Sequence, residues 1–377
     1  LRAGLETASV AALVALSLPF ISIAATARGG VQGRERFGMV ASLQFVEISC
    51  KVLCGTVLVL LGFGVAGAVA GFLIGGMVAA ALGLYYLIYR LGVRLRGPIE
   101  LPALNMVAPM FGALLGLSLL LNLDLVTLKL LSEGRALVGY YQAGIVLANA
   151  PYYLVTAALV PILFVQLARF DSVAETRKTV GETLGMAFVL VLPIELILMV
   201  FPHEMLAMLF PSSYAPGAPS LRLLAIGNAL LILVGILSAT FQAIGRAKVP
   251  ALILLAVATV EPVVLWMVVP NREALGAASV FIGASATALL CLGAVYLRGL
   301  GTGAVRQALP WLYRYVTALG IGSVAGYAAL GTGVGSNVAL AVGGACYLGA
   351  ALALRLVILP LPNGRMLGAK PVPSGEK

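Results

Sequence analysis

Residues 66–84 read AGAVAGFLIGGMVAAALGL, a run of 19 residues without a charged side chain. A helix rises about 1.5 Å per residue, so a run of this length approaches the ~30 Å hydrocarbon core of a bilayer. The run lacks the polar–apolar alternation that a strand of a membrane barrel requires. It therefore predicts a membrane-spanning helix.

Ten more apolar runs, two before this one and eight after it, lie almost end to end along the chain. The whole sequence is 61% hydrophobic and only 10% charged. A soluble protein has no core large enough to bury eleven such helices. We predict an all-α polytopic membrane protein with about eleven transmembrane helices and no independent extramembrane domain. The predicted helices cover residues 7–26, 38–62, 66–89, 103–131, 138–167, 183–201, 219–245, 249–269, 275–297, 311–330 and 337–360.

The net charge of +10 comes mostly from Lys and Arg residues between the apolar runs. It therefore indicates contact with anionic lipid headgroups and no nucleic-acid partner. Of the 24 basic residues, 17 lie in the loops after every second helix, starting with the first, and three lie in the opposite loops. Because such an excess marks the cytoplasmic side, we expect a multi-pass protein of the cytoplasmic (inner) membrane. Its first residue would be external and its C-terminus cytoplasmic.

Two segments 212 residues apart look alike. Residues 33–36 read GRER and 245–248 read GRAK, and each is followed by a helix with one glutamate near its middle, Glu47 or Glu261. Both helices would run in the same direction, as in transporters built from two parallel halves. Recurrence of Gly-Arg turns by chance at basic helix ends is the alternative reading.

The repeat also predicts the domain organisation. The first three helices would be the second half of an incomplete first lobe, residues 1–97, whose earlier helices are absent from this chain. A complete six-helix lobe would follow at 98–300, then two additional helices at 301–361 and a cytoplasmic tail at 362–377. The first residue, Leu1, is not Met, which agrees with a chain that lacks its true beginning.

Charged side chains inside predicted helices are candidate functional residues. Each costs roughly 2.5–3.5 kcal/mol at the centre of a membrane helix, so it requires a reason to be there. Glu47 and Lys51, one turn apart, either line a polar cavity or neutralise each other. Asp124 lies nearer a helix end, where a solvated role is an alternative. The candidates for a substrate or coupling cavity are Glu47, Lys51, Asp124, Glu195, Arg222 and Glu261.

Several features are expected to have no catalytic role. The sequence has no phosphate-binding Gly-x-x-x-x-Gly-Lys-Ser/Thr loop, and its only histidine, His203, falls in a predicted external loop. The four cysteines have no histidine or carboxylate cluster beside them that would complete a metal site. Residues 169–182 are predicted to form an amphipathic cytoplasmic helix, which acts as a solvated linker or, as the alternative, connects the lobes or binds a partner. We expect no enzyme activity, no catalytic residue and no bound metal.

Four short motifs together resemble a known family. They are VGYYQA at 138–143 after Asp124, FPSSY at 210–214 followed by LRLL at 221–224, QAIGR at 242–246, and GFGVAG at 62–67. Each is weak alone, but they span most of the chain. The chain resembles the polysaccharide and O-antigen flippases of the multidrug/oligosaccharidyl-lipid/polysaccharide exporter superfamily, which usually have twelve to fourteen spans.

The resemblance implies a two-lobed, MATE-like carrier that flips a polyprenyl-pyrophosphate-linked oligosaccharide to the outer leaflet by alternating access. A proton or sodium gradient would drive it through carboxylates such as Glu47, Glu195 or Glu261, and glycosyltransferases or a polymerase of the same pathway would be partners. Lys51 and Arg222 favour an anionic substrate. The alternatives are a multidrug or small-cation antiporter, a flippase for the lipid-linked peptidoglycan precursor, and a membrane-embedded polymerase or glycosyltransferase.

Overall fold

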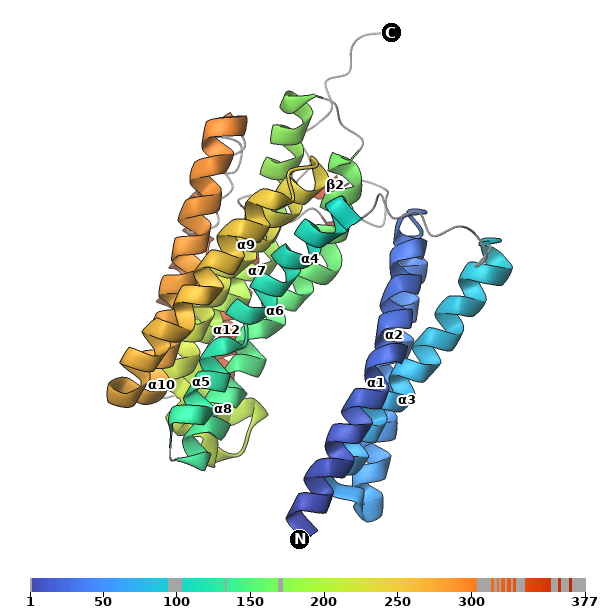
Figure 1. Ribbon diagram of the computed structural model, residues 1–377. Coiled ribbons are helices and arrows are strands. Elements are labelled where there is room, and N and C mark those ends of the chain that lie inside the picture. The colour runs from blue at the N-terminus through green and yellow to red at the C-terminus, as the bar shows by residue number, and fades with distance from the viewer. Residues whose placement is uncertain are drawn as a thin grey trace. The chain divides into compact units, whose positions relative to one another are not determined.

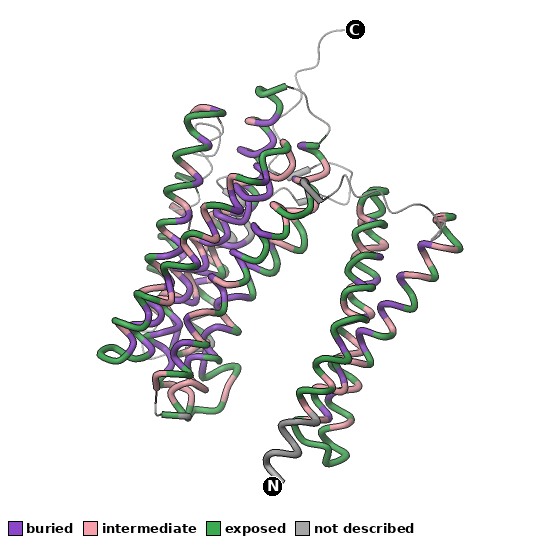
Figure 2. Tube along the Cα trace, in the orientation of Figure 1, coloured by how far each residue is buried: buried purple, intermediate pink, exposed green. Residues whose placement is uncertain are grey.

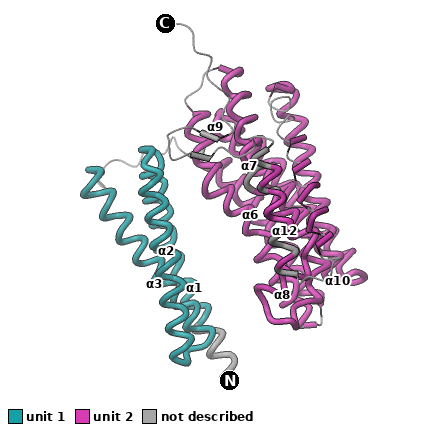
Figure 3. The backbone as a smooth tube through the Cα atoms, turned by 180° about the vertical axis from the view of Figure 1, so that it is seen from behind, with its two compact units in different colours: residues 1–101 teal, residues 102–377 magenta. Residues whose placement is uncertain are grey.

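A computed structural model gives the fold of the chain (Figure 1). Contacts between Cα atoms divide it into two compact units, Leu1–Leu101 (unit 1) and Pro102–Lys377 (unit 2), which are coloured separately in Figure 3. The structure describes residues 2–93, 104–132, 134–168, 172–303, 313–314, 317–318, 320–322, 324–326, 328–329, 336–353, 359–360 and 366–367.

Unit 1 is a three-helix arrangement in which α3 (Gly64–Tyr85) packs against both α1 (Arg2–Gln32) and α2 (Phe37–Leu58). Short π-helical turns extend α2 at Val59–Phe63 and α3 at Tyr86–Arg90. Few of its residues are buried (Figure 2), and large apolar side chains cover its outer faces. Such a surface suits contact with lipid tails.

Glycines on one face of α3 set the distance between α3 and α2. A Cβ atom added to Gly71 would lie 2.5 Å from the Cα of Gly55, and one added to Gly75 would lie 2.4 Å from the Cγ of Lys51. The small-residue steps at 67, 71 and 75 therefore allow close helix packing, as the sequence predicts.

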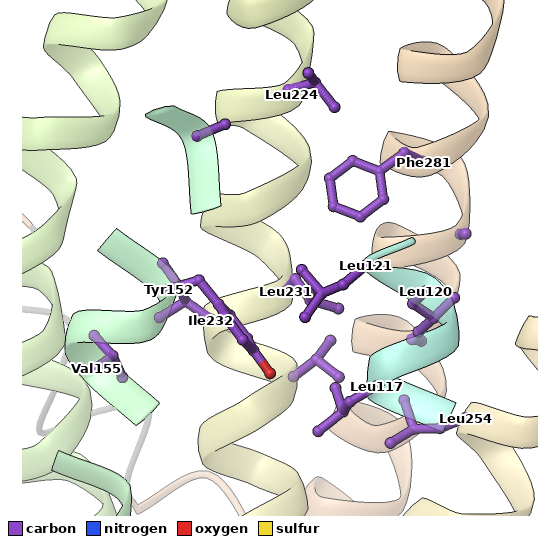
Figure 4. Packing of buried hydrophobic residues seen from close by; sticks show 14 of the residues in the cluster. Leu117, Leu120, Leu121, Tyr152, Val155, Leu224, Leu231, Ile232, Leu254 and Phe281 are labelled. Carbon is purple, nitrogen blue, oxygen red and sulfur yellow. The ribbon is translucent and has the colours of Figure 1, made fainter. Parts of the chain in front are cut away.

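Unit 2 is built around α9, which packs against α6, α7 and α10 and is the most buried of its long helices (Figure 2). Figure 4 shows part of the core, where Leu224 and Leu231 of α9 lie near Phe281 of α10 and near Leu121, which directly follows α4. The elements of unit 2 are α4 (Leu104–Leu120), α5 (Leu123–Leu131), α6 (Arg135–Leu167), α7 (Val173–Val200), α8 (Pro202–Leu209), the 3₁₀ turn η4 (Ser212–Gly217), α9 (Ala218–Ala243), α10 (Lys248–Leu300), α12 (Ser336–Ala353), β1 (Leu359–Pro360) and β2 (Met366–Leu367).

Each unit contains a helical hairpin, and the elements of the two hairpins have matching lengths. The chain leaves α2 at Gly62 (φ 93°) and reverses into α3, and it reverses within α10 at Glu273 (φ 46°). Gly62 and Glu273 are 211 residues apart, as are the helix ends Gln32 and Ala243. The predicted repeat thus extends to the lengths of its elements, but Glu47 and Glu261 are 214 residues apart and do not occupy equivalent positions.

The all-α fold agrees with the prediction, although several predicted helix limits are wrong. By length and composition, the described residues contain six helices able to cross a membrane, or seven if α4 and α5, bent by 43°, form one span. Two of the six, Phe37–Arg90 and Lys248–Leu300, are the hairpins. The total of eleven stays a prediction, because eight residues of the predicted helix 311–330 lie outside the described residues, as do most residues of the tail.

Three helices differ in length from the prediction. α1 continues from the predicted end at 26 to Gln32, and α7 begins ten residues early, at Val173, where the Ser172 side chain accepts a hydrogen bond from the backbone N–H of Ala174. The amphipathic helix predicted at 169–182 is therefore continuous with α7 from Val173 onward. The predicted helix 337–360 is described only to Ala353, and its last two residues pair with Met366–Leu367 as a short antiparallel strand.

Within each unit, connections that the charge pattern assigns to the same side of the membrane lie close together. In unit 1, Nη1 of Arg36, in the turn before α2, donates to the Tyr86 hydroxyl near the end of α3 at 2.9 Å. In unit 2, a Cβ atom added to Gly299 near the end of α10 would lie 3.5 Å from Nη1 of Arg246 in the turn before α10. Loops assigned to one side of the membrane thus meet within each unit.

The close α2–α3 contact predicts that Gly71→Ala destabilises the protein. The new methyl group would meet the backbone of Gly55, which cannot rotate away, so we expect overpacking to cost about 1–3 kcal/mol. Thermal unfolding in detergent measures the effect. Gly38→Ala in α2 is the control, since a Cβ atom at that position meets nothing within 4 Å. Equal melting temperatures for the two variants would contradict the packing described.

Candidate functional site

Glu47 is the centre of a buried ion network in unit 1. Its carboxylate is held between two cations: Oε1 accepts a hydrogen bond from Nζ of Lys51 at 2.6 Å, and Oε2 accepts one from Arg28 of α1. Only 5% of the Glu47 side chain is exposed. The network joins α1 to α2 and combines the two candidates Glu47 and Lys51 with a third residue, Arg28.

This network carries more positive than negative charge. Neutralising Glu47 for membrane insertion requires only one cation, yet two are present, and the side chains of Arg28 and Lys51 retain 22% and 18% exposure. The Lys51 ammonium also lies 5.3 Å from the ring centre of Phe72 on α3, where cation–π attraction stabilises it. The surplus charge is placed where an anionic group could reach it.

A second group of polar residues lies in unit 2, where α4 and α5 meet at their bend. Asp124, in the first turn of α5, is 1% exposed. Its Oδ2 accepts a hydrogen bond from the Tyr141 hydroxyl at 2.7 Å, and its Oδ1 accepts one from the Leu125 N–H at 2.7 Å. The burial is inconsistent with a solvated Asp124. Polar groups at a broken membrane helix are typical of substrate or ion sites.

Glu261 on α10 is the neighbour of this pair. It is 2% exposed, and neither carboxylate oxygen has a hydrogen-bond partner among the described residues. Its carboxyl group is close enough to interact electrostatically with the side chains of Asp124 and Tyr141. A buried polar group without a partner is costly, which makes Glu261 a candidate for binding an ion or a ligand.

Glu261 lines a cavity of about 840 Å³ between the two arms of α10. Most of the wall is apolar and includes Val257, Val260 and Val264. Asn271 and Arg272 add polar groups at the turn of the hairpin, the end that the charge pattern predicts to be external. The cavity combines an apolar wall with one buried carboxylate among its described lining residues.

The remaining two candidates do not join either group. Glu195 on α7 is 1% exposed, and its two carboxylate oxygens have no partner in the described part of the chain. Arg222, at the start of α9, is exposed, and its Nε donates to the Met199 carbonyl at 2.8 Å. It thus satisfies a carbonyl at the end of α7, and it lines a 290 Å³ pocket beside His203 and Glu204.

Sequence reasoning missed Arg28 and Tyr141. Arg28 falls two residues beyond the predicted end of its helix, and nothing in the sequence relates it to Glu47, which is 19 positions later. Tyr141 carries no charge, although it lies in the VGYYQA motif that follows Asp124. The structure pairs Arg28 with Glu47 and Tyr141 with Asp124.

Comparisons with known proteins give the family. A family model described as "Polysaccharide biosynthesis protein" matches residues 5–219, more than half of the chain. The chain belongs to this family. No curated protein matches the chain.

Among solved structures, that of a "Lipid II flippase MurJ, inward closed conformation" matches with a TM-score of 0.64. The match covers 89% of this chain and 72% of that one at 14% sequence identity. At this identity the similarity shows a shared fold. The polysaccharide biosynthesis family member is therefore a multi-pass, all-α membrane protein with a MurJ-like fold.

The ion network predicts unequal effects of removing its members. Glu47→Gln leaves two half-buried cations without a carboxylate, and this loss should approach about 3–5 kcal/mol, the cost of a broken buried ion pair. Lys51→Met leaves the Arg28–Glu47 pair in place and should cost clearly less. Thermal unfolding in detergent tests the order, with exposed Arg34→Gln as the control. A larger loss for Lys51→Met would show that Glu47 is not the centre of the network.

Proposed function

We propose that this family member flips a polyprenyl-pyrophosphate-linked oligosaccharide from the cytoplasmic to the outer leaflet, by alternating access, during surface polysaccharide synthesis. The family and the fold shared with a lipid II flippase support a lipid-linked substrate. The observation that carries the proposal is the surplus positive charge of the Arg28–Glu47–Lys51 network.

The charge of this network favours an anionic substrate. Two cations around one carboxylate leave a net charge of about +1 in a helix bundle that faces hydrocarbon, which is a cost that an arriving anion would offset. Guanidinium and ammonium groups are the usual protein ligands of phosphate oxygens. In this proposal Arg28 and Lys51 contact the pyrophosphate while Glu47 holds them in place.

Asp124 and Glu261 are the proposed coupling site for a proton or a sodium ion. They are buried, lie near each other, and Glu261 has oxygens that no described residue satisfies. Tyr141 fixes one oxygen of Asp124. A cation bound between the two carboxylates would reduce their repulsion, and so its arrival would change the free energy of this part of unit 2.

A multidrug antiporter is the second candidate function because of the α10 cavity. A volume of about 840 Å³, an apolar wall and one carboxylate would also suit an organic cation. The network in unit 1 favours the glycan substrate.

For the proposed glycan flippase, we expect a location in the cytoplasmic membrane with the C-terminal tail in the cytoplasm. The glycosyltransferases or polymerase of the same pathway would be its neighbours there.

Export of surface glycan tests the substrate proposal. In cells whose own copy of the gene is deleted, we expect Lys51→Ala in the full-length protein to reduce surface polysaccharide at least tenfold, because a charge-assisted contact to phosphate is lost. Lys51→Arg should restore part of the export. Lys129→Ala is the matched control, since it removes an exposed lysine near the end of α5.

Membrane levels of each variant are measured in the same cells, so that poor folding is distinguished from lost transport. Normal glycan export by a well-inserted Lys51→Ala protein would contradict the proposal. Increased drug sensitivity with unchanged glycan would favour the antiporter.

A separate substitution tests the coupling site. Glu261→Gln keeps the size of the side chain but removes the charge that would bind a cation, so transport should no longer respond to an imposed proton or sodium gradient. The measurement compares transport into membrane vesicles with and without an ionophore. Glu182→Gln, an exposed acid on α7, is the control and should keep the response. A full gradient response in Glu261→Gln would exclude Glu261 from coupling.

A further inference from the structure

Two arginine side chains of unit 2 lie at the end of α10 that the charge pattern assigns to the cytoplasmic side. Arg177, in the second turn of α7, lies against the chain after α10, so a Cβ atom added to Gly301 would be 3.1 Å from its Nη2. Arg246 reaches the same end from the turn before α10, where a Cβ atom added to Gly299 would be 3.5 Å from its Nη1. Both arginines thus lie against the same short segment, residues 299–301.

Two buried polar atoms at this place lack a partner in the described part of the chain. They are the Nε of Arg177 and the hydroxyl oxygen of Tyr296, and neither forms a hydrogen bond with any described residue. Tyr296 is 3% exposed, its ring lies edge-on to Phe241 at 6.4 Å, and the Arg177 charge is close enough to act on its phenol group. Buried donors normally have an acceptor, so these two atoms are available to form hydrogen bonds with a ligand.

Attraction to the C-terminal end of α10 explains only part of this arrangement. A cation near the last carbonyl groups of a helix is favourable, but one arginine suffices and the Nε of Arg177 has no acceptor among the described residues. The two ion pairs in the described part of the chain both involve Glu47, so neither arginine has a carboxylate partner there. The nearby acids of α7, Glu175 and Glu182, are exposed.

We propose that Arg177, Arg246 and Tyr296 form a binding site for the phosphate of an anionic phospholipid headgroup. The fork of a guanidinium group matches phosphate oxygens, and the tyrosine hydroxyl supplies a further donor. Gly299 and Gly301 leave the backbone without side chains, which lets Arg177 and Arg246 approach it. The predicted cytoplasmic location fits, because that leaflet carries anionic lipids. The site is independent of the proposed transport function.

Lipid binding to the purified protein in detergent tests the site. Phosphatidylglycerol should raise the melting temperature of the wild-type protein more than phosphatidylcholine does, and native mass spectrometry should show a retained phosphatidylglycerol molecule. Arg177→Gln and Tyr296→Phe should each weaken that binding about tenfold, as expected for the loss of a hydrogen bond to a charged group. Lys178→Gln, which removes an exposed charge next to Arg177, is the matched control and should bind normally.

Tyr296→Phe preserves the ring packing against Phe241, so it tests the site even if Arg177→Gln fails to fold. Equal stabilisation by the two lipids would overturn the proposal, as would equal phosphatidylglycerol binding by Tyr296→Phe and Lys178→Gln. Inorganic phosphate is added as a separate arm. If it stabilises the protein as much as phosphatidylglycerol at the same concentration, a lipid is not the ligand.

Discussion

Hydrocarbon neither solvates a charge nor hydrogen-bonds to a peptide group, and this constraint governs both units. The backbone of the described membrane-spanning segments is helical. The charged side chain Glu47 in unit 1 forms ion pairs with neighbouring residues, whereas some carboxylate oxygens in unit 2 have no hydrogen-bond partner among the described residues. Glu47 is satisfied by two cations from neighbouring helices. Asp124 is satisfied by Tyr141 and a backbone N–H, whereas both oxygens of Glu261 lack a described partner.

The two copies of the hairpin have similar helices but different charged residues. Their turns occur 211 residues apart at Gly62 and Glu273, so the helices of the two copies have matching lengths. In the first copy, the glycine at 75 lets α3 approach the stem of Lys51. In the second, the arms separate around a cavity lined by Glu261. We interpret the first as suited to an anionic group and the second to a cation.

Hydrophobic runs and loop charges predicted the helical fold and most helix positions, because both follow directly from the cost of moving residues into a bilayer. They could not predict the ends of α1 or α7, since polar residues such as Arg28 and Thr176 continue a helix once tertiary contacts bury part of them. The candidate acids were found by charge alone. Their partners were not, because the Arg28–Glu47 and Tyr141–Asp124 contacts depend on how separate helices pack.

Movement of a lipid-linked glycan across a reconstituted bilayer is the decisive measurement for the proposed flippase activity. Proteoliposomes containing the full-length protein would receive a fluorescent polyprenyl-pyrophosphate oligosaccharide, and a membrane-impermeant quencher would report how much reaches the protected leaflet. We expect protein-dependent movement that slows when Arg28 or Lys51 is replaced by a neutral residue. Movement at the rate of protein-free vesicles, or equal rates for wild-type and neutralised proteins, would contradict this activity.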